Sequence, residues 1–126
     1  MTTVLDASAL LAYLMDEPGS EVVDGVLAES FMSSVNWAEV VQRSIAAGVE
    51  VNGIRADLQS LGLTIEPFTA EDGETAGRLW AQTRNAGLSL GDRACLSLGL
   101  RTALPVMTCD RAWASLKLSL DVQIIR

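Results

Sequence analysis

Four acidic residues are the chemically most informative feature of the chain: Asp6, Glu39, Asp92 and Asp110. Each stands where an apolar, strand-like run gives way to a helix, or near the start of a helix. In an open α/β sheet such positions gather along one edge, whatever their separation in sequence. Four carboxylates at one edge repel one another strongly, and a divalent cation offsets that repulsion. Because the chain contains no histidine, the set indicates a hard cation with oxygen ligands, Mg²⁺ foremost, rather than zinc.

Each acid also has a purely structural explanation, because carboxylates stabilise helix N-termini. The first and last acids can cap the helices that follow them. Asp92 can complete a capping box with Ser89, and Glu39 can do so with Asn36. Capping alone does not require acids to follow strands that end at the same edge of a sheet. The four together therefore favour a shared site.

Two hydroxyl residues stand close to these acids in sequence. Ser8 lies two residues after Asp6, and Thr108 lies two residues before Asp110. Such hydroxyls can orient a carboxylate or a metal-bound water. Local helix-cap hydrogen bonds are the alternative explanation for both.

Short apolar runs alternate with helical patterns along the chain. The predicted strands cover residues 2–5, 31–34, 63–67, 105–108 and 122–125. The predicted helices cover residues 7–15, a segment with Pro18 in its first turn, and residues 36–47, 51–61, 69–85, 89–103 and 110–116. This alternation is typical of an α/β fold. We expect a single domain over residues 1–126, with a short, mostly parallel central sheet of about four to five strands and helices on both faces.

The overall charge limits the function classes. A net charge of −7 and a pI near 4.4 argue against a nucleic-acid binder, unless several acids bind divalent cations. An acidic surface also suits a basic partner protein. No apolar run is long enough to cross a bilayer, and Cys95 and Cys109 read as reduced, unpaired thiols. These features predict a soluble cytoplasmic protein that does not engage a membrane.

The chain resembles the PIN-domain family, and specifically the small VapC-type ribonuclease toxins of type II toxin–antitoxin systems. The resemblance rests on four segments that occur in order over nearly the whole chain. They are VLDASALL at residues 4–11, NWAEV at 36–40, LSLGDRA at 88–94 and TCDRAW at 108–113. Each motif is weak alone, and the ordered set is specific.

The resemblance implies a metal-dependent endoribonuclease, a hydrolase that acts as the toxin of a toxin–antitoxin pair. It implies that Asp6, Glu39, Asp92 and Asp110 form a catalytic pocket for Mg²⁺ or Mn²⁺, with Asp6 and Asp92 as the most direct ligands and Thr108 in support. It further implies a homodimer, and a hetero-oligomer with a VapB-type antitoxin that places a basic side chain in the acidic pocket. RNA is the implied substrate.

Several residues beside the acids carry weaker expectations. Arg93 and Arg111, each next to an acid, are candidates to contact RNA phosphates, with a solvated helix charge as the alternative. Trp113 is expected to pack against the loop of the fourth acid rather than to stack on a base. Trp37 and Trp80 are expected in the core or in a dimer contact.

Two rival functions remain open from the sequence. One is a catalytically silent PIN-like binding module, which would keep the fold without the reaction. The other is a phosphoacceptor receiver domain, also a small α/β protein with an acidic pocket. A receiver needs adjacent acids after its first strand, and Asp6 stands alone.

Overall fold

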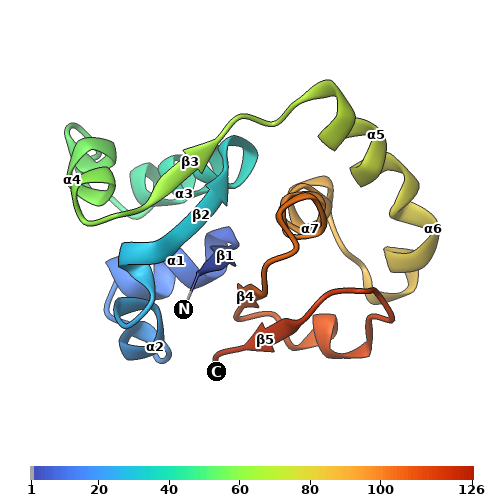
Figure 1. Ribbon diagram of the computed structural model, residues 1–126. Helices are drawn as coiled ribbons and strands as arrows, with labels where there is room; N and C mark the ends of the chain where they lie inside the picture. The colour runs from blue at the N-terminus through green and yellow to red at the C-terminus, as the bar shows by residue number, and fades with distance from the viewer. Residues whose placement is uncertain (1) are drawn as a thin grey trace.

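A computed structural model, which describes residues 2–126, shows a five-stranded parallel sheet. The strand order is β3-β2-β1-β4-β5, so the chain starts in the middle and builds outward in both directions (Figure 1). The strands are β1 (Thr3–Leu5), β2 (Ser30–Ser33), β3 (Thr64–Glu66), β4 (Val106–Thr108) and β5 (Val122–Ile124). All four pairings are parallel, which confirms the predicted sheet.

Helices connect the strands, as parallel pairing requires. They are α1 (Ala7–Leu14), α2 (Ser20–Asp24), α3 (Ser34–Ala46), α4 (Ile54–Ser60), α5 (Ala70–Arg78), α6 (Trp80–Thr83) and α7 (Leu90–Thr102). Three short 3-10 helices complete the chain: η1 (Leu27–Glu29), η2 (Arg84–Ala86) and η3 (Arg111–Ser115). Figure 1 shows α7 between the sheet and α5, far from α4 at the other side of the molecule.

The core has two parts, one on each face of the sheet. Successive side chains of a strand point to opposite faces. Leu5 and Met107 accordingly join the cluster packed against α1, whereas Val4 and Val106 join the cluster packed against α7. The four residues are almost wholly buried. Burial on both faces explains why the central strands contain no alternating polar residues.

Several predicted helices differ from the structure: the one over 51–61 begins only at Ile54, and the one over 110–116 is the 3-10 helix η3. The predicted helix over 69–85 is broken into α5, α6 and η2. The break lies at Leu79, and the Ala76 carbonyl, which a continuing helix would pair with Trp80 N, accepts from Arg93 Nη1 at 2.8 Å. The helix expected with Pro18 in its first turn begins only at Ser20 and ends at Asp24, so Pro18 lies outside it.

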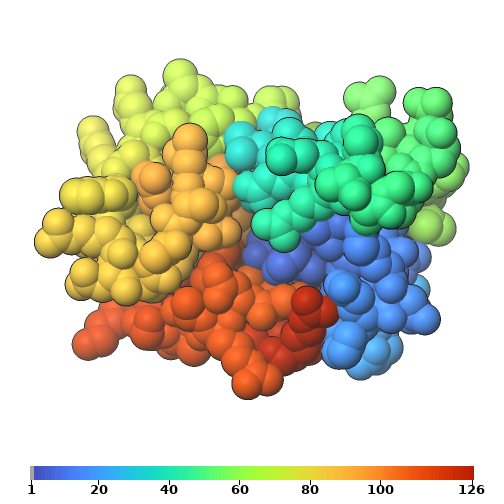
Figure 2. Space-filling view, turned by 180° about the vertical axis from the view of Figure 1, so that it is seen from behind, coloured from blue at the N-terminus to red at the C-terminus, as the bar shows by residue number. Residues whose placement is uncertain are grey.

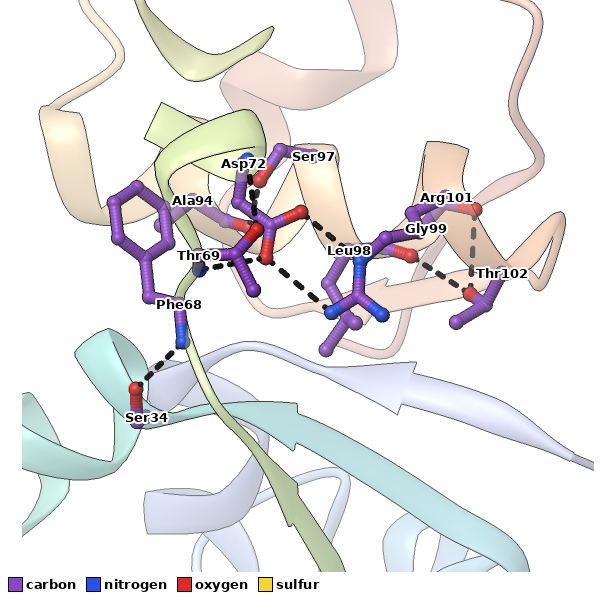
Figure 3. A network of polar contacts seen from close by, with 10 residues as sticks. All are labelled: Ser34, Phe68, Thr69, Asp72, Ala94, Ser97, Leu98, Gly99, Arg101 and Thr102. Carbon is purple, nitrogen blue, oxygen red and sulfur yellow. Dashed lines mark hydrogen bonds and ion pairs between the residues drawn. The ribbon is translucent and has the colours of Figure 1, made fainter. Parts of the chain in front are cut away.

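An ion pair between buried Asp72 and exposed Arg101 fastens α5 to α7 (Figure 3). Asp72 closes the capping box of α5 with Thr69 and also accepts from Arg101 Nε at 3.0 Å and Nη2 at 3.3 Å. Burial opposes the charge of Asp72, but the hydrogen bonds from Arg101 and Thr69 outweigh it and lower the pKa of Asp72. The ion pair therefore holds α7, which carries Asp92, against the outer helices.

Replacing Arg101 by Met is expected to lower the free energy of unfolding at pH 7 by about 1–3 kcal/mol, because it leaves a buried carboxylate without its cation. Since the pKa of Asp72 is lowered in the folded state, this stabilisation is present above the ordinary carboxyl pKa of 3.8 and is lost as the pH falls through the folded pKa. Urea unfolding at pH 7 and pH 3 measures the difference, with Arg55→Met in exposed α4 as the control. A deficit of equal size at both pH values would contradict the ion-pair explanation.

Candidate active site

The four acids predicted to act together line one pocket of about 440 Å³ at the carboxyl ends of β1 and β4. Asp6 follows β1, Glu39 lies on α3, Asp92 lies on α7, and Asp110 follows β4. Figure 2 views this face, where the dark-blue start of the chain is visible between the cyan α3 region, the orange segment and the red C-terminal end. Residues up to 104 positions apart in sequence thus meet at one edge of the sheet.

Asp6 is the most tightly held of the four. It caps α1 through its Oδ1, which accepts from Ala9 N (2.8 Å) and from Ser8 Oγ (2.7 Å). Its Oδ2 accepts from Thr108 Oγ1 at 2.6 Å. Burial raises the pKa of Asp6 to about 6, against the opposing effect of these hydrogen bonds, and the nearby Asp92 charge raises it further. The protein therefore positions this carboxylate without neutralising it.

The two hydroxyls also join the loops that follow β1 and β4. Ser8 Oγ accepts from Cys109 N at 2.9 Å, and Thr108 Oγ1 accepts from Asp110 N at 3.0 Å. Each hydroxyl thus donates to the first acid while holding the backbone that leads to the fourth. Both predicted supporting residues lie where they can orient the site.

Three of the acids, Asp6, Asp92 and Asp110, both cap a helix and line the pocket. Asp92 forms the predicted capping box with Ser89, through Ser89 N to Oδ2 at 2.9 Å. Asp110 caps η3 by accepting from Ala112 N at 2.9 Å. Because a helix N-terminus lies beside the carboxyl end of a strand, one carboxylate can cap the helix and face the pocket.

Glu39 reaches the pocket differently. The predicted capping box with Asn36 is wrong, because α3 begins at Ser34 with Ser33 as its cap, which places Glu39 in the second turn. Asn36 is buried and donates from Nδ2 to the Gly91 carbonyl at 2.9 Å, which ties α3 to the first turn of α7. Burial and the Asp92 charge raise the pKa of Glu39, while Arg43 and Asn36 lower it.

Two basic residues line the pocket that the sequence interpretation missed. Arg43 stands four residues after Glu39, a spacing that puts both on one face of α3 and could have identified it. Arg126 arrives with the segment after β5 and donates from Nη1 to Glu17 at 3.4 Å. No local pattern predicts its position, because that depends on the pairing of β5 beside β4.

The two arginines proposed as phosphate contacts lie elsewhere. Arg93 donates from Nη1 to the Ala76 carbonyl at 2.8 Å, so it faces α5 and not the pocket. Arg111 is exposed and donates from Nε to the Arg126 carbonyl at 3.2 Å. Neither side chain lines the pocket. Their part in RNA binding stays a prediction.

The aromatic and sulfur residues are placed as follows. Trp113 is 1% exposed and packs in the core cluster of α7, which confirms packing rather than base stacking. Trp37 packs at the edge of the other cluster, whereas Trp80 is 52% exposed. Cys95 is buried and Cys109 half-buried, and both are unpaired thiols, as expected.

The donor atoms of the pocket suit a hard cation. Within residues 2–126, no three Asp, Glu or Cys side chains converge closely enough to form a complete ion site by themselves. The pocket offers carboxylate and hydroxyl oxygens from several elements, and the pKa values of Asp6 and Glu39 are raised because their hydrogen bonds and the Arg43 charge only partly offset burial and the Asp92 charge. Mg²⁺ keeps several waters and takes only one or two carboxylates directly, so these residues fit such an ion.

Fold and pocket together define an α/β domain with an acidic site at the carboxyl edge of a parallel sheet. A model of the PIN domain matches residues 3–117, and the chain belongs to the PIN domain family. This membership excludes the receiver-domain alternative. A comparison with curated proteins gives no significant match.

Solved structures share the fold at low sequence identity. A toxin–antitoxin complex from Klebsiella pneumoniae has a chain 15% identical, with a TM-score of 0.72 over 95% of this chain and 99% of that one. VapBC2 from Rickettsia felis, bound to a DNA fragment from its promoter, has a chain 16% identical, with a TM-score of 0.67 over all of both chains. VapBC-5 from Mycobacterium tuberculosis has one 22% identical, with a TM-score of 0.62 over 99% and 98%.

None of the helices in residues 2–126 is both long enough and apolar enough to cross a membrane.

Proposed function

We propose that this protein is a metal-dependent endoribonuclease and the toxin of a toxin–antitoxin pair. The observation that carries the proposal is the convergence of four carboxylates, from four separate elements, in one pocket of a PIN-domain chain. Such a cluster is electrostatically costly, and chains retain costly charge clusters chiefly where they bind or react.

The residues would divide the work as follows. Asp6 and Asp92 would hold the cation directly, and Glu39 and Asp110 would complete the pocket around it. A bound Mg²⁺ or Mn²⁺ supplies an activated water and offsets the negative charge that develops on the phosphodiester. Thr108 would hold the carboxylate of Asp6 in position through its 2.6 Å hydrogen bond.

An antitoxin partner is supported by the fold relatives and by charge. The structures with the same fold come from toxin–antitoxin and VapBC complexes. In this chain two basic and thirteen acidic residues give residues 1–77 a net charge of −11. A VapB-type antitoxin with basic side chains would find a complementary surface there. A homodimer, and a hetero-oligomer with the antitoxin, remain part of the same proposal.

The test is cleavage of RNA by the purified protein, freed of any partner, with Mg²⁺, with Mn²⁺ and with a chelator. Cleavage is expected only with a metal ion, and Asp92→Asn is expected to reduce it at least about a hundredfold, since even outer-shell changes cost 10–100-fold. Asp24→Asn, an exposed acid on α2, is the matched control. RNA that stays intact under all conditions would instead support the catalytically silent binding module.

A further inference from the structure

The basic residues of the chain are concentrated in its second half. Seven basic and three acidic residues give residues 78–126 a net charge of +4, in contrast to the −11 of residues 1–77. Two of those three acids, Asp92 and Asp110, belong to the active-site pocket. Figure 2 shows the yellow and orange segments of the second half on one side of this face and the blue-to-green segments of the first half on the other, with the yellow-green α5 of the first half beside the yellow segment. A polyanion is therefore attracted to one side of the pocket and repelled from the other.

An aromatic side chain stands exposed on the basic side. Trp80, at the start of α6, is 52% exposed, although an aromatic ring of this size normally contributes to a core. The Arg84 guanidinium lies 5.2 Å from the centre of the Trp80 ring. A tryptophan with an arginine at its face offers both stacking and positive charge, the combination that single-stranded nucleic acid uses.

A pocket that neither Trp80 nor Arg84 lines is formed partly by the same segment of the chain. It has a volume of about 420 Å³, lies between η2 and η3, and is lined by Gln82, Asn85, Ala86, Ser115, Leu116 and Lys117. The segments 75–91 and 111–120, which form this region, contain no acidic residue. Amide and ammonium groups therefore line a hollow where phosphates and base edges would find donors.

This region is connected to the active site along the chain by two short paths. Ala86 precedes Ser89 by three residues, a span of at most about 11 Å. η3 begins directly after its cap, Asp110, and rises about 2 Å per residue toward Ser115. At about 3.4 Å per nucleotide, the rise along one strand of a nucleic-acid double helix, either distance corresponds to roughly three nucleotides of RNA.

We infer that single-stranded RNA enters the active-site pocket across the surface formed by α6, η2 and η3, with a base stacked on the Trp80–Arg84 pair and phosphates held by Arg84 and Lys117. The inference rests on the proposed nuclease function in taking RNA as the ligand. A second copy of the chain is disfavoured as the occupant, because a two-fold contact would bring this basic surface against its own copy, where like charges repel.

The test is the affinity for a fluorescent single-stranded RNA of about 12 nucleotides, measured by anisotropy in a chelator so that no cleavage occurs. Trp80→Ala is expected to weaken binding roughly five- to a hundredfold, the range seen for lost stacking, while Trp80→Phe keeps most of the affinity. Leu61→Ala is the control, because Leu61 is also 52% exposed but lies in the acidic half. Thermal melting verifies that each variant is folded.

Charge is tested separately through salt dependence. The double variant Arg84→Gln/Lys117→Gln is expected to reduce the slope of log K against log[salt] by about 1.4, or 0.7 for each lost phosphate contact. Arg55→Gln, an exposed arginine of the acidic half, is expected to leave the slope unchanged.

Three results would overturn the inference: no RNA binding by the wild type, wild-type affinity in both the Trp80→Ala and the double variant, or a loss of self-association in Trp80→Ala at unchanged RNA affinity. These outcomes are separable from the fate of the proposed function. Metal-dependent cleavage with unaffected binding in the variants would refute the surface and keep the nuclease. RNA binding that depends on Trp80, without any cleavage, would support the binding surface and refute the nuclease.

Discussion

Replacing Asp6 by Asn is expected to abolish metal-dependent RNA cleavage and, at the same time, to stabilise the fold at neutral pH. The loss of activity should reach at least about a hundredfold, because Asp6 is proposed to hold the cation directly and even an outer-shell group costs 10–100-fold when lost. The gain in stability follows from the burial of Asp6, which raises its pKa from 3.8 to about 6. The ionised carboxylate of Asp6 thus lowers the stability of the fold at neutral pH.

The sign of the pH effect follows from linkage. A carboxyl group whose pKa is raised in the folded state binds its proton more tightly there than in the unfolded chain. Its contribution to stability is fully present below pH 3.8 and is lost as the pH rises through about 6. A shift of this size corresponds to roughly 3 kcal/mol at neutral pH, at about 1.4 kcal/mol per pKa unit. Asparagine does not ionise, so the variant escapes this loss.

The measurement is urea unfolding of wild type and Asp6→Asn from pH 4 to pH 8. The difference between the two proteins should grow as the pH rises, and taking the difference cancels the titration of other acids such as Asp72. Mg²⁺ should raise the melting temperature of the wild type and not that of the variant, because ligands stabilise only the state that binds them. A variant that is less stable than wild type by the same amount at every pH would refute the argument.

The sheet and the position of three acids could be predicted because they depend on local chemistry. The short runs 2–5 and 105–108, with an apolar pair in each, read as buried strands, and an acid within two residues of such a strand must emerge at its carboxyl end. The capping boxes of Ser89 with Asp92 and of Thr69 with Asp72 are also patterns within four residues. Parallel pairing of the strands then brings their carboxyl ends, and the acids that follow them, to one edge of the sheet.

The remaining features of the site depend on contacts between elements. Arg126 enters the pocket only because β5 pairs beside β4, and the buried Asn36 matters only because α3 lies against α7. At the break after α5, the Ala76 carbonyl accepts from Arg93 of α7. The spacing of apolar residues along the sequence does not predict these contacts, because each joins elements that are distant in sequence.

Gly91 is the clearest case of such a relation, and Gly91→Ala is expected to remove most of the activity while leaving the fold intact. A Cβ at this position would overlap Oε1 of Glu39, so the carboxylate of Glu39 would have to leave its place beside Asp92. Alanine is favoured over glycine in a helix by about 1 kcal/mol, which offsets part of the steric cost to stability. We therefore expect a loss of activity of at least about tenfold with a melting temperature near that of the wild type.

A double-mutant cycle tests whether Gly91 acts through Glu39. If it does, Gly91→Ala should have little further effect on cleavage in a Glu39→Ala background, where no carboxylate remains to be displaced. Gly77→Ala in α5 is the matched control, because a Cβ there meets nothing within 4 Å, and it should raise stability without changing activity. Losses that simply multiply in the double variant would show that Gly91 serves the site by another route, such as the hydrogen bond of its carbonyl with Asn36. The cycle thereby distinguishes two roles of Gly91: leaving space for the Glu39 carboxylate, and providing the carbonyl that accepts from Asn36.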